Sequence, residues 1–338
     1  MKLPTPSFAH LLSMSTPLGT YEHCALSTPR VEHGYCTDDV ARVLLVVARE
    51  PHPTVEVAQM ATTALGFLAA AQGENGQFRN RRRSSGTWFG PLTSSDWWGR
   101  AMWALGTAVA RSNDERLRAG AQQLFERGTQ TSSSWTRSSA FAALGAGEIL
   151  SIDPAHVLAK QVISEAARVI SQPELSDEWR WPEERLTYAN ATLPEARMVI
   201  GSVLGDDRLV QSGLRQLQWL LDLESTPGHL SVTPARGRGR DFDGRKFDQQ
   251  PIEVAAMSDA CVRAFELTGN AQWLQGHDLA AQWFAGRNDV GVAMYDPLTG
   301  GGYDGLTADG PNFNQGAEST IALLTTLQHA RRFEKAAS

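Results

Sequence analysis

The sequence is poor in cysteine, and its three cysteines fit no metal-binding or disulfide spacing. Cys24, Cys36 and Cys261 are odd in number and unpaired along the chain, so we predict neither a disulfide framework nor a zinc site. The eight histidines are scattered without an HxH or HxxxH pair. No glycine-rich loop opens a helix in the pattern that holds phosphates. We therefore expect neither a metal nor a cofactor.

The sequence also lacks a large charge excess and a long apolar run. Its 31 Lys and Arg against 37 Asp and Glu leave a net charge of −6, which gives no basis for binding nucleic acid or an anionic membrane. No apolar run reaches membrane-spanning length, and the first residues lack the apolar core of a signal peptide. We expect a cytoplasmic, soluble protein, of an oligomeric state that the sequence does not indicate.

Strand-like alternation is a third absence. Apolar residues recur instead at helical spacing, which predicts about eleven helices and a possible short one at residues 6–14. Short connections, such as Gly205 to Asp206, alternate with long loops that carry most of the Trp, Tyr, Asp and Asn. This rhythm is typical of repeated helical hairpins.

A weak internal repeat supports the hairpins. Ser or Thr followed five positions later by Arg recurs at the start of four pairs: Thr37 with Arg42, Ser95 with Arg100, Ser132 with Arg137, and Thr192 with Arg197. Six hairpins close into an (α/α)6 toroid, so we predict an all-α, single-domain toroid over residues 1–338. A helical solenoid is the alternative, but its repeats would be shorter and more regular.

The stretch at residues 34–50, GYCTDDVARVLLVVARE, is the most informative. Thr37 is a good N-cap, and Asp38 and Asp39 follow where the helix dipole favours negative charge. Arg42 lies one turn after Asp38 on the same face. The Leu/Val run behind them has no polar face, so we expect a helix buried all round.

In such a toroid the long loops and the first turns of the inner helices lie at one end, where they would form an active-site mouth. Carboxylates among aromatic rings and amides are what a sugar site needs. The predicted catalytic residues are Asp39, Asp96 and Glu253. The predicted substrate-binding residues are Asp38, Arg42, Trp97, Arg100, Trp181, Glu183, Tyr188, Asn190, Gln250, Tyr303, Asp304, Asn314 and Glu318.

Each of these residues also has a structural interpretation. An Asp at a helix start is more often a cap than a catalyst. Glu253 and Glu318 stand where a capping-box Glu reaches back, Trp97 fits an apolar core, and Arg100 neutralises nearby carboxylates. The functional interpretation depends on their expected convergence at one end.

Five blocks of the sequence resemble a bacterial family of (α/α)6-toroid, glycosidase-like domains, which stand alone or follow a glycosyltransferase domain. The blocks are GYCTDDVAR, SSDWWGRAMWALG, WRWPEERLTYANA, FDQQPIEVAAMSDAC, and YDGL followed by NFNQGAEST. The resemblance implies carbohydrate-active chemistry on mannose- or glucose-type glycans. The chain departs from the pattern at Val40, where the family tends to have Asn, and at Ala189, where it tends to have Asp. The βαβ alternation of a nucleotide-sugar domain is absent.

The residues favour an inverting glycoside hydrolase acting on an oligosaccharide. Asp96, in a first turn with Arg100 four residues on, suits an ionised general base. Asp39 or Glu253 is the better candidate for the acid. The alternatives are a phosphorylase, a sugar epimerase and a non-catalytic glycan-binding domain. An epimerase would want a pair of histidines in the cavity, and the absence of His from the inner-helix starts counts against it.

Overall fold

The computed structural model describes residues 3–226, 228–242, 244 and 246–337, and the chain divides into two compact units. The N-terminal unit comprises residues 11–171 and 199–207. The C-terminal unit comprises residues 1–10, 172–198 and 208–338. The short helix α1 (Ala9–Ser13) crosses the first boundary along the chain.

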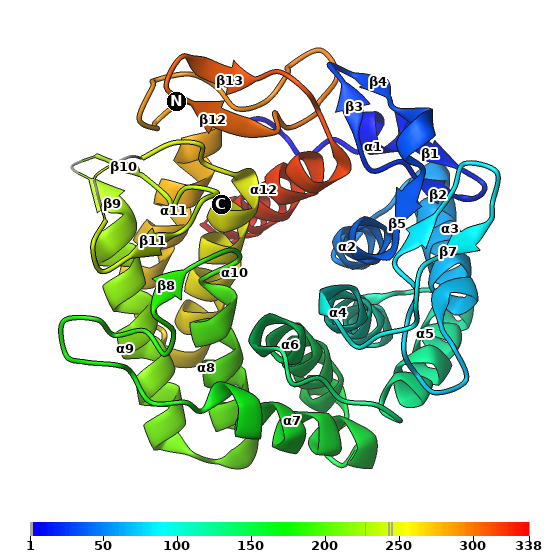
Figure 1. Ribbon diagram of the computed structural model, residues 1–338, viewed down its shortest axis with the longest axis horizontal. Coiled ribbons are helices and arrows are strands. Elements are labelled where there is room, and N and C mark those ends of the chain that lie inside the picture. Colours follow the sequence, from blue (N-terminus) through cyan, green and yellow to red (C-terminus); the bar gives the residue numbers. More distant parts are fainter. Residues whose placement is uncertain (1–2, 227, 243, 245, 338) are drawn as a thin grey trace. The chain divides into compact units, whose positions relative to one another are not determined.

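The N-terminal unit consists of three consecutive helical hairpins (Figure 1). Their helices are α2 (Thr37–Ala48), α3 (Val55–Ala71), α4 (Asp96–Arg111), α5 (Glu115–Gly128), α6 (Thr136–Ile152) and α7 (Val157–Ile170). Helix α4 packs between α2 and α6, whereas α3, α5 and α7 each pack as the second helix of a hairpin. In α2 every residue except Asp38 is buried, which confirms the expectation of a helix without a solvent face.

Helices α4 and α6 approach unusually closely because glycines face each other. A Cβ built on Gly106 would lie 2.1 Å from the Gly145 carbonyl oxygen, and one on Gly99 would lie 2.3 Å from that of Ser138. Only a residue without a side chain fits at such distances. Helices α4 and α6 therefore pack backbone against backbone, and their first turns are held in a fixed relation.

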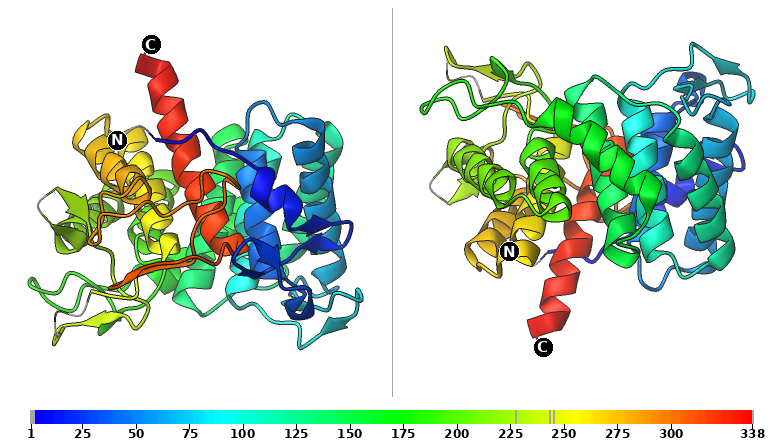
Figure 2. Two further views of the ribbon diagram at one scale, coloured as in Figure 1. Left: turned by 90° about the horizontal axis from the view of Figure 1, so that it is seen from above. Right: turned by 90° about the horizontal axis from the view of Figure 1, so that it is seen from below.

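The C-terminal unit is helical as well, and its helices can be followed from green to red in Figure 2. They are α8 (Thr192–Leu204) and α9 (Asp207–Glu224), which both begin or end across the boundary, then α10 (Pro251–Thr268), α11 (Gln272–Phe284) and α12 (Ala317–Ala337). Helix α10 packs against both α11 and α12. It begins with Pro251 at its first turn and ends at Gly269 in the left-handed conformation, the usual start and stop signals.

Strands are short and lie in the loops. They are β1 (Ser15–Thr16), β2 (Gly19–Thr20), β3 (Cys24–Ala25), β4 (Thr28–Pro29), β5 (Tyr35–Cys36), β6 (Arg81–Arg82), β7 (Trp88–Phe89), β8 (Arg185–Leu186), β9 (Ser225–Thr226), β10 (His229–Leu230), β11 (Arg238–Gly239), β12 (Gly305–Thr307) and β13 (Gly310–Asn312). All pair antiparallel, in ribbons of two strands and one sheet of order β5-β6-β7. A 3-10 turn covers Val31–His33.

One predicted helix cap is wrong in detail. Thr37 is the first residue of α2 and not its cap, because its hydroxyl donates to the carbonyl of Arg79 at 2.6 Å, while the Cys36 sulfur accepts from the Asp39 N–H. Helix α7 begins at Val157, and the His156 ring nitrogen caps it by accepting from the Ala159 N–H at 3.2 Å. Within the described residues, no helix is long and apolar enough to cross a membrane.

Candidate active site

The first turn of α2 carries a compact ion network. The Arg42 guanidinium bonds to Asp38 and, at 2.7 Å, to Asp39 Oδ1. The other oxygen of Asp39 accepts from the Cys36 thiol at 3.1 Å. Burial, with Asp39 adding a smaller contribution, raises the pKa of that thiol well above its usual value, so it stays protonated as a donor. Asp39 is buried between these donors, whereas Asp38 is half-buried.

Helix α4 contributes a second arginine to this network. The Arg100 Nε lies 3.9 Å from Asp38 Oδ1, and its guanidinium lies 3.6 Å from the centroid of the Phe141 ring on α6. Stacking on an aromatic face leaves the edge of a guanidinium available for hydrogen bonds. Asp38 therefore lies between Arg42 and Arg100, which fixes its position from two helices.

Asp96 and Trp97 open α4 and are both half-buried. The Trp97 indole N–H donates to the carbonyl of Phe78 at 2.9 Å, which fixes the ring. The Ser138 hydroxyl of α6 lies 2.9 Å from the carbonyl oxygens of both Ser94 and Ser95. The start of α4 is thus tied to the first turn of α6, as the predicted convergence of inner-helix starts requires within this unit.

Glu253 of α10 is not part of a capping box. Its carboxylate accepts three hydrogen bonds, from the backbone N–H groups of Ala189 and, at 3.1 Å, Asn190, and from the Asn190 side-chain amide at 2.9 Å. Three donors aimed at one carboxylate favour its charged form. Asn190 in turn accepts from the Thr187 N–H at 2.9 Å. Glu253 therefore fixes the turn that leads into α8.

The aromatic loop before this turn is packed more deeply than expected. Trp181 is completely buried, stacks on Trp219 and donates to Glu183 Oε2 at 3.4 Å. Its ring offers no face to a ligand in this structure, so the predicted substrate contact is not supported. Tyr188 is 42% exposed and keeps a ring in solvent.

The last long loop, which precedes α12, is also bonded to the start of that helix by a predicted site residue. Asp304 Oδ1 accepts from the Gly316 N–H at 2.7 Å and the Ser319 hydroxyl at 2.9 Å, which anchors the start of α12. The Asn314 carbonyl accepts from the Asp304 N–H at 2.8 Å. Burial raises the pKa of Tyr303, whose ring packs edge-on against Phe313. The half-buried side chains of Gln250 and Glu318 stand at the starts of α10 and α12.

Glu224, at the end of α9, is a buried carboxyl that the sequence analysis did not single out. Burial, and secondarily the charge of Glu253, raises its pKa to about 8, although the Thr233 N–H donates to it at 2.9 Å. The pattern LLDLEST reads as an outer-helix terminus, and no sequence signal indicates that its Glu turns inward. The C-terminal unit thus contains a second buried carboxyl whose pKa is raised further by the charge of Glu253.

Trp135, at the start of α6, was also not singled out. It is 65% exposed and precedes Thr136, the first residue of the helix. The sequence does contain a usable signal, since a tryptophan follows three serines immediately before an inner helix.

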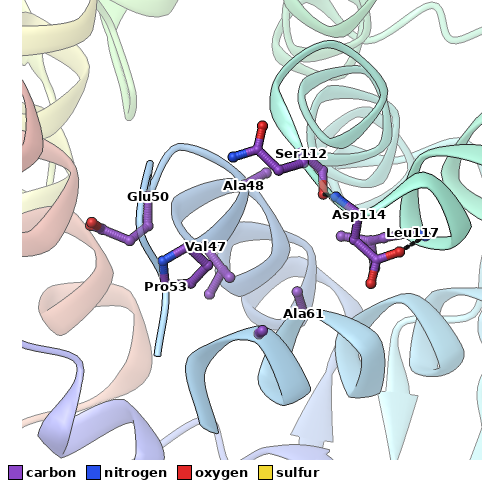
Figure 3. Close-up of a pocket in the computed structure, with 10 residues that line it drawn as sticks. Val47, Ala48, Glu50, Pro53, Ala61, Ser112, Asp114 and Leu117 are labelled. Atoms are coloured by element: carbon purple, nitrogen blue, oxygen red, sulfur yellow. Dashed lines mark hydrogen bonds between the residues drawn. The ribbon is translucent and has the colours of Figure 1, made fainter. Parts of the chain in front are cut away.

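A cavity of about 280 Å³ lies at the C-terminal ends of α2 and α4, whereas the predicted site residues stand at their N-terminal ends (Figure 3). It is lined by Val47 and Ala48 at the end of α2, by Ala61 of α3, and by Ser112 and Leu117 around the α4–α5 turn. Val47 lies nine residues after Asp38 along α2, which separates the cavity from the first turn of this helix by about 13 Å along the axis. The cavity is therefore separate from the predicted site.

One group of side chains in the N-terminal unit has the spacing of metal ligands. Ligand atoms of Glu22, Cys36 and Asp39 lie within 4.8 Å of one another. Arg42 bonds to Asp39 and Arg81 to Glu22, so two guanidinium groups already balance the charge that would attract a cation. The donor set does not fit a metal ion.

No family model and no curated protein matches the sequence, but solved structures match the fold. A sugar epimerase from a ruminal bacterium aligns with a TM-score of 0.72 at 13% identity, covering 96% of this chain and 95% of that one. The cellulase Cel9M of C. cellulolyticium, in complex with cellobiose, gives 0.63 at 10% identity over 94% and 88%. A GH76 α-mannanase from Bacteroides thetaiotaomicron gives 0.58 at 10% identity over 90% and 87%.

These structures are (α/α)6-toroid enzymes, and the likeness extends over nearly the whole chain. At such low identity it establishes the fold and not the activity. The predicted fold class is confirmed, and the family resemblance is supported at the level of fold. The chain is an (α/α)6 toroid whose inner-helix starts carry acidic and aromatic side chains.

Proposed function

We propose that this protein is a carbohydrate-active enzyme, an inverting glycoside hydrolase acting on mannose- or glucose-type oligosaccharides. The observation that supports this proposal is the half-buried Asp96, placed beside the half-buried Trp97 at a helix start that Ser138 fixes. A carboxylate, a flat apolar face and a fixed geometry are what sugar hydrolysis requires. The toroid fold is shared with a cellulase and an α-mannanase.

In this proposal Asp96 is the general base. It takes a proton from water as the water oxygen bonds to the anomeric carbon, while the glycosidic C–O bond breaks on the opposite face. A second carboxyl gives its proton to the departing oxygen. Asp38, held by Arg42 and Arg100, would accept hydrogen bonds from substrate hydroxyls.

Asp39 and Glu253 are the two candidates for the acid, and each of them also contacts several hydrogen-bond donors. Asp39 faces Arg42 and the Cys36 thiol, and Glu253 faces three N–H groups. Donors of this kind favour the ionised form, whereas an acid must hold its proton. The next experiment therefore decides, for each of the two, between the role of general acid and that of a positioning residue.

The test compares Asp96→Asn, Asp39→Asn and Glu253→Gln with the wild type on natural oligosaccharides and on glycosides with an activated leaving group. Loss of general-base catalysis lowers kcat by about 10²–10⁴-fold on both substrates. Loss of an acid spares the activated substrate. A positioning residue would instead change stability and KM together. NMR would read the anomer released before mutarotation, and inverted product is expected.

Sugar epimerisation is the second candidate, because a sugar epimerase has the same fold over nearly the whole chain. Two histidines face each other in the C-terminal unit, but they lie within helices and not at inner-helix starts, which argues against epimerisation. His277 and His329 lie in the middle of α11 and the second half of α12, and both are buried. They bond to Ser258 at 2.8 Å and Asp259 at 2.6 Å.

The same NMR assay separates the alternatives. An epimerase would convert the reducing-end sugar without releasing a fragment, and a phosphorylase would yield sugar 1-phosphate only when phosphate is present. Saturable binding without turnover, equal in wild type and Asp96→Asn, would exclude the catalytic proposal and leave a glycan-binding domain.

A further inference from the structure

Trp135 has by far the most exposed indole of the protein. Of the ten tryptophans, Trp135 is 65% exposed, Trp88, Trp97 and Trp219 are half-buried, and the remaining six are buried. A large aromatic surface left in water is unfavourable for the free protein by the ordinary hydrophobic effect. An exposed aromatic side chain on a fixed backbone is a better candidate for ligand binding than one on a mobile backbone.

The backbone that carries this ring is fixed by hydrogen bonds. The Trp135 N–H donates to the Ser133 hydroxyl at 3.2 Å, and its carbonyl accepts from the Ser139 N–H at 2.9 Å. The Ser139 hydroxyl closes the turn by donating to the Ser133 carbonyl at 2.9 Å. The indole therefore projects from an ordered turn, so binding a ligand would cost little chain ordering.

The position of this turn connects it to the proposed active site. Ser138, three residues after Trp135, bonds to the backbone just before Asp96, and Gly99 packs against the same serine. Both Trp135 and Asp96 thus stand at helix starts that are joined by direct contacts within the N-terminal unit. A chain of sugars that occupied the site at Asp96 could extend towards Trp135.

The surroundings of the ring indicate a neutral ligand. Residues 128–136, GTQTSSSWT, contain no charged side chain between the exposed Arg127 and the buried Arg137, and Ser132 and Ser134, which precede the indole, are exposed. Hydroxyls beside an aromatic face suit a sugar ring, whose CH groups stack while its hydroxyls exchange hydrogen bonds. A membrane-binding or nucleic-acid-binding surface would be expected to carry a cluster of exposed Lys or Arg around the ring.

We propose that Trp135 is the stacking platform of an outer sugar subsite, one that binds a neutral pyranose of an oligosaccharide away from the bond that is cleaved. The proposal rests on the proposed function, since it takes the substrate to be an oligosaccharide. It adds that the enzyme prefers longer chains over short ones, because only a longer chain reaches this platform.

The test uses Trp135→Ala, Trp135→Phe and a control, Val157→Ala, with gluco- and manno-oligosaccharides from disaccharide to hexasaccharide. Val157 is 76% exposed on the same hairpin, at the far end of the 17-residue helix α6, about 25 Å away. We expect Trp135→Ala to weaken binding of long chains about tenfold, as for loss of one aromatic contact. Short chains should be unaffected, Trp135→Phe should restore part of the affinity, and Val157→Ala should match the wild type.

Calorimetry on the Asp96→Asn background measures binding without turnover, and fluorescence offers a direct readout. The exposed indole should give a quenchable, red-shifted emission that is absent in Trp135→Phe and that long oligosaccharides protect. If the protein binds oligosaccharides and Trp135→Ala leaves the affinity unchanged at every chain length, the stacking platform is refuted while the proposed function stands. No binding or turnover of any oligosaccharide by the wild type would overturn the proposed function itself.

Discussion

At the scale of single residues, several carboxylates of the predicted site hold neighbouring backbone or side chains in place by hydrogen bonds. Glu253 fixes the turn at Ala189 and Asn190, and Asp304 fixes the start of α12. Asp39 orients Arg42, which in turn bonds to Asp38. Asp96 and Asp38 are half-buried, and in the proposed function they contact the substrate.

Glu253→Gln should destabilise the protein by about 1–3 kcal/mol, because the new amide would face N–H donors that now bond to a carboxylate. Chemical denaturation followed by circular dichroism would measure the free energy of unfolding. Glu266→Gln is the control: Glu266 bonds to Arg332 at 2.6 Å nearer the surface, and its loss should cost below about 1 kcal/mol. Equal effects of the two changes would contradict the anchoring role.

Glu224 should make the stability of the protein fall as pH rises. Its pKa is raised by burial from 4.5 to about 8, so between these values the folded state keeps a proton that the unfolded state has lost. Stability present below pH 4.5 is therefore lost progressively up to pH 8, by about 1.4 kcal/mol per pH unit at most. Glu224→Gln, which cannot ionise, should flatten this slope. Parallel pH profiles of wild type and variant would show that Glu224 does not titrate in this window.

At the scale of elements, α4 and α6 cross with their backbones in close contact. Two glycines of this crossing, Gly106 and Gly145, leave room only for hydrogen: a Cβ on Gly145 would lie 2.2 Å from the Met102 carbonyl oxygen. The same crossing sets the relation between Asp96 on α4 and Trp135 before α6. A change there should therefore affect stability and site geometry together.

Gly106→Ala and Gly145→Ala should each destabilise the fold by about 1–3 kcal/mol or more, because neighbouring backbone cannot move aside easily. Gly66→Ala on α3 is the matched control, since nothing lies within 4 Å of its Cβ position. There alanine should stabilise the helix by up to about 1 kcal/mol through its better helix propensity. Thermal unfolding would distinguish the opposite signs, and a neutral Gly106→Ala would refute the close crossing.

At the scale of the whole molecule, a ligand that binds only the folded toroid must raise its stability. At a hundredfold excess over Kd the gain is about 2.7 kcal/mol, which for a chain of this size corresponds to a rise of a few degrees in Tm. We expect this shift with long neutral oligosaccharides, and a smaller one for Trp135→Ala at the same concentration. An acidic polysaccharide is the control, and a shift of equal size with it would point to non-specific binding.

Much of the fold was predictable from local sequence. Helical spacing, the caps at Asp114 and Gly269 and the alternation of short and long connections define the hairpins. The candidate acidic residues could be found because they stand at helix starts. Their partners could not, since Glu253 meets Asn190 from 63 positions away, and no local pattern encodes such a contact.

The sequence by itself determined the helical class, the repeated hairpins and the gathering of Asp, Trp and Arg at inner-helix starts, because these depend on periodicity and capping within a few residues. Only the tertiary structure decided which side chains are exposed and which are engaged. Burial and hydrogen bonding depend on neighbours that are distant along the chain. That is why Trp181 lies in the core while Trp135 faces solvent, and why Glu224, hidden at a helix terminus, keeps its proton.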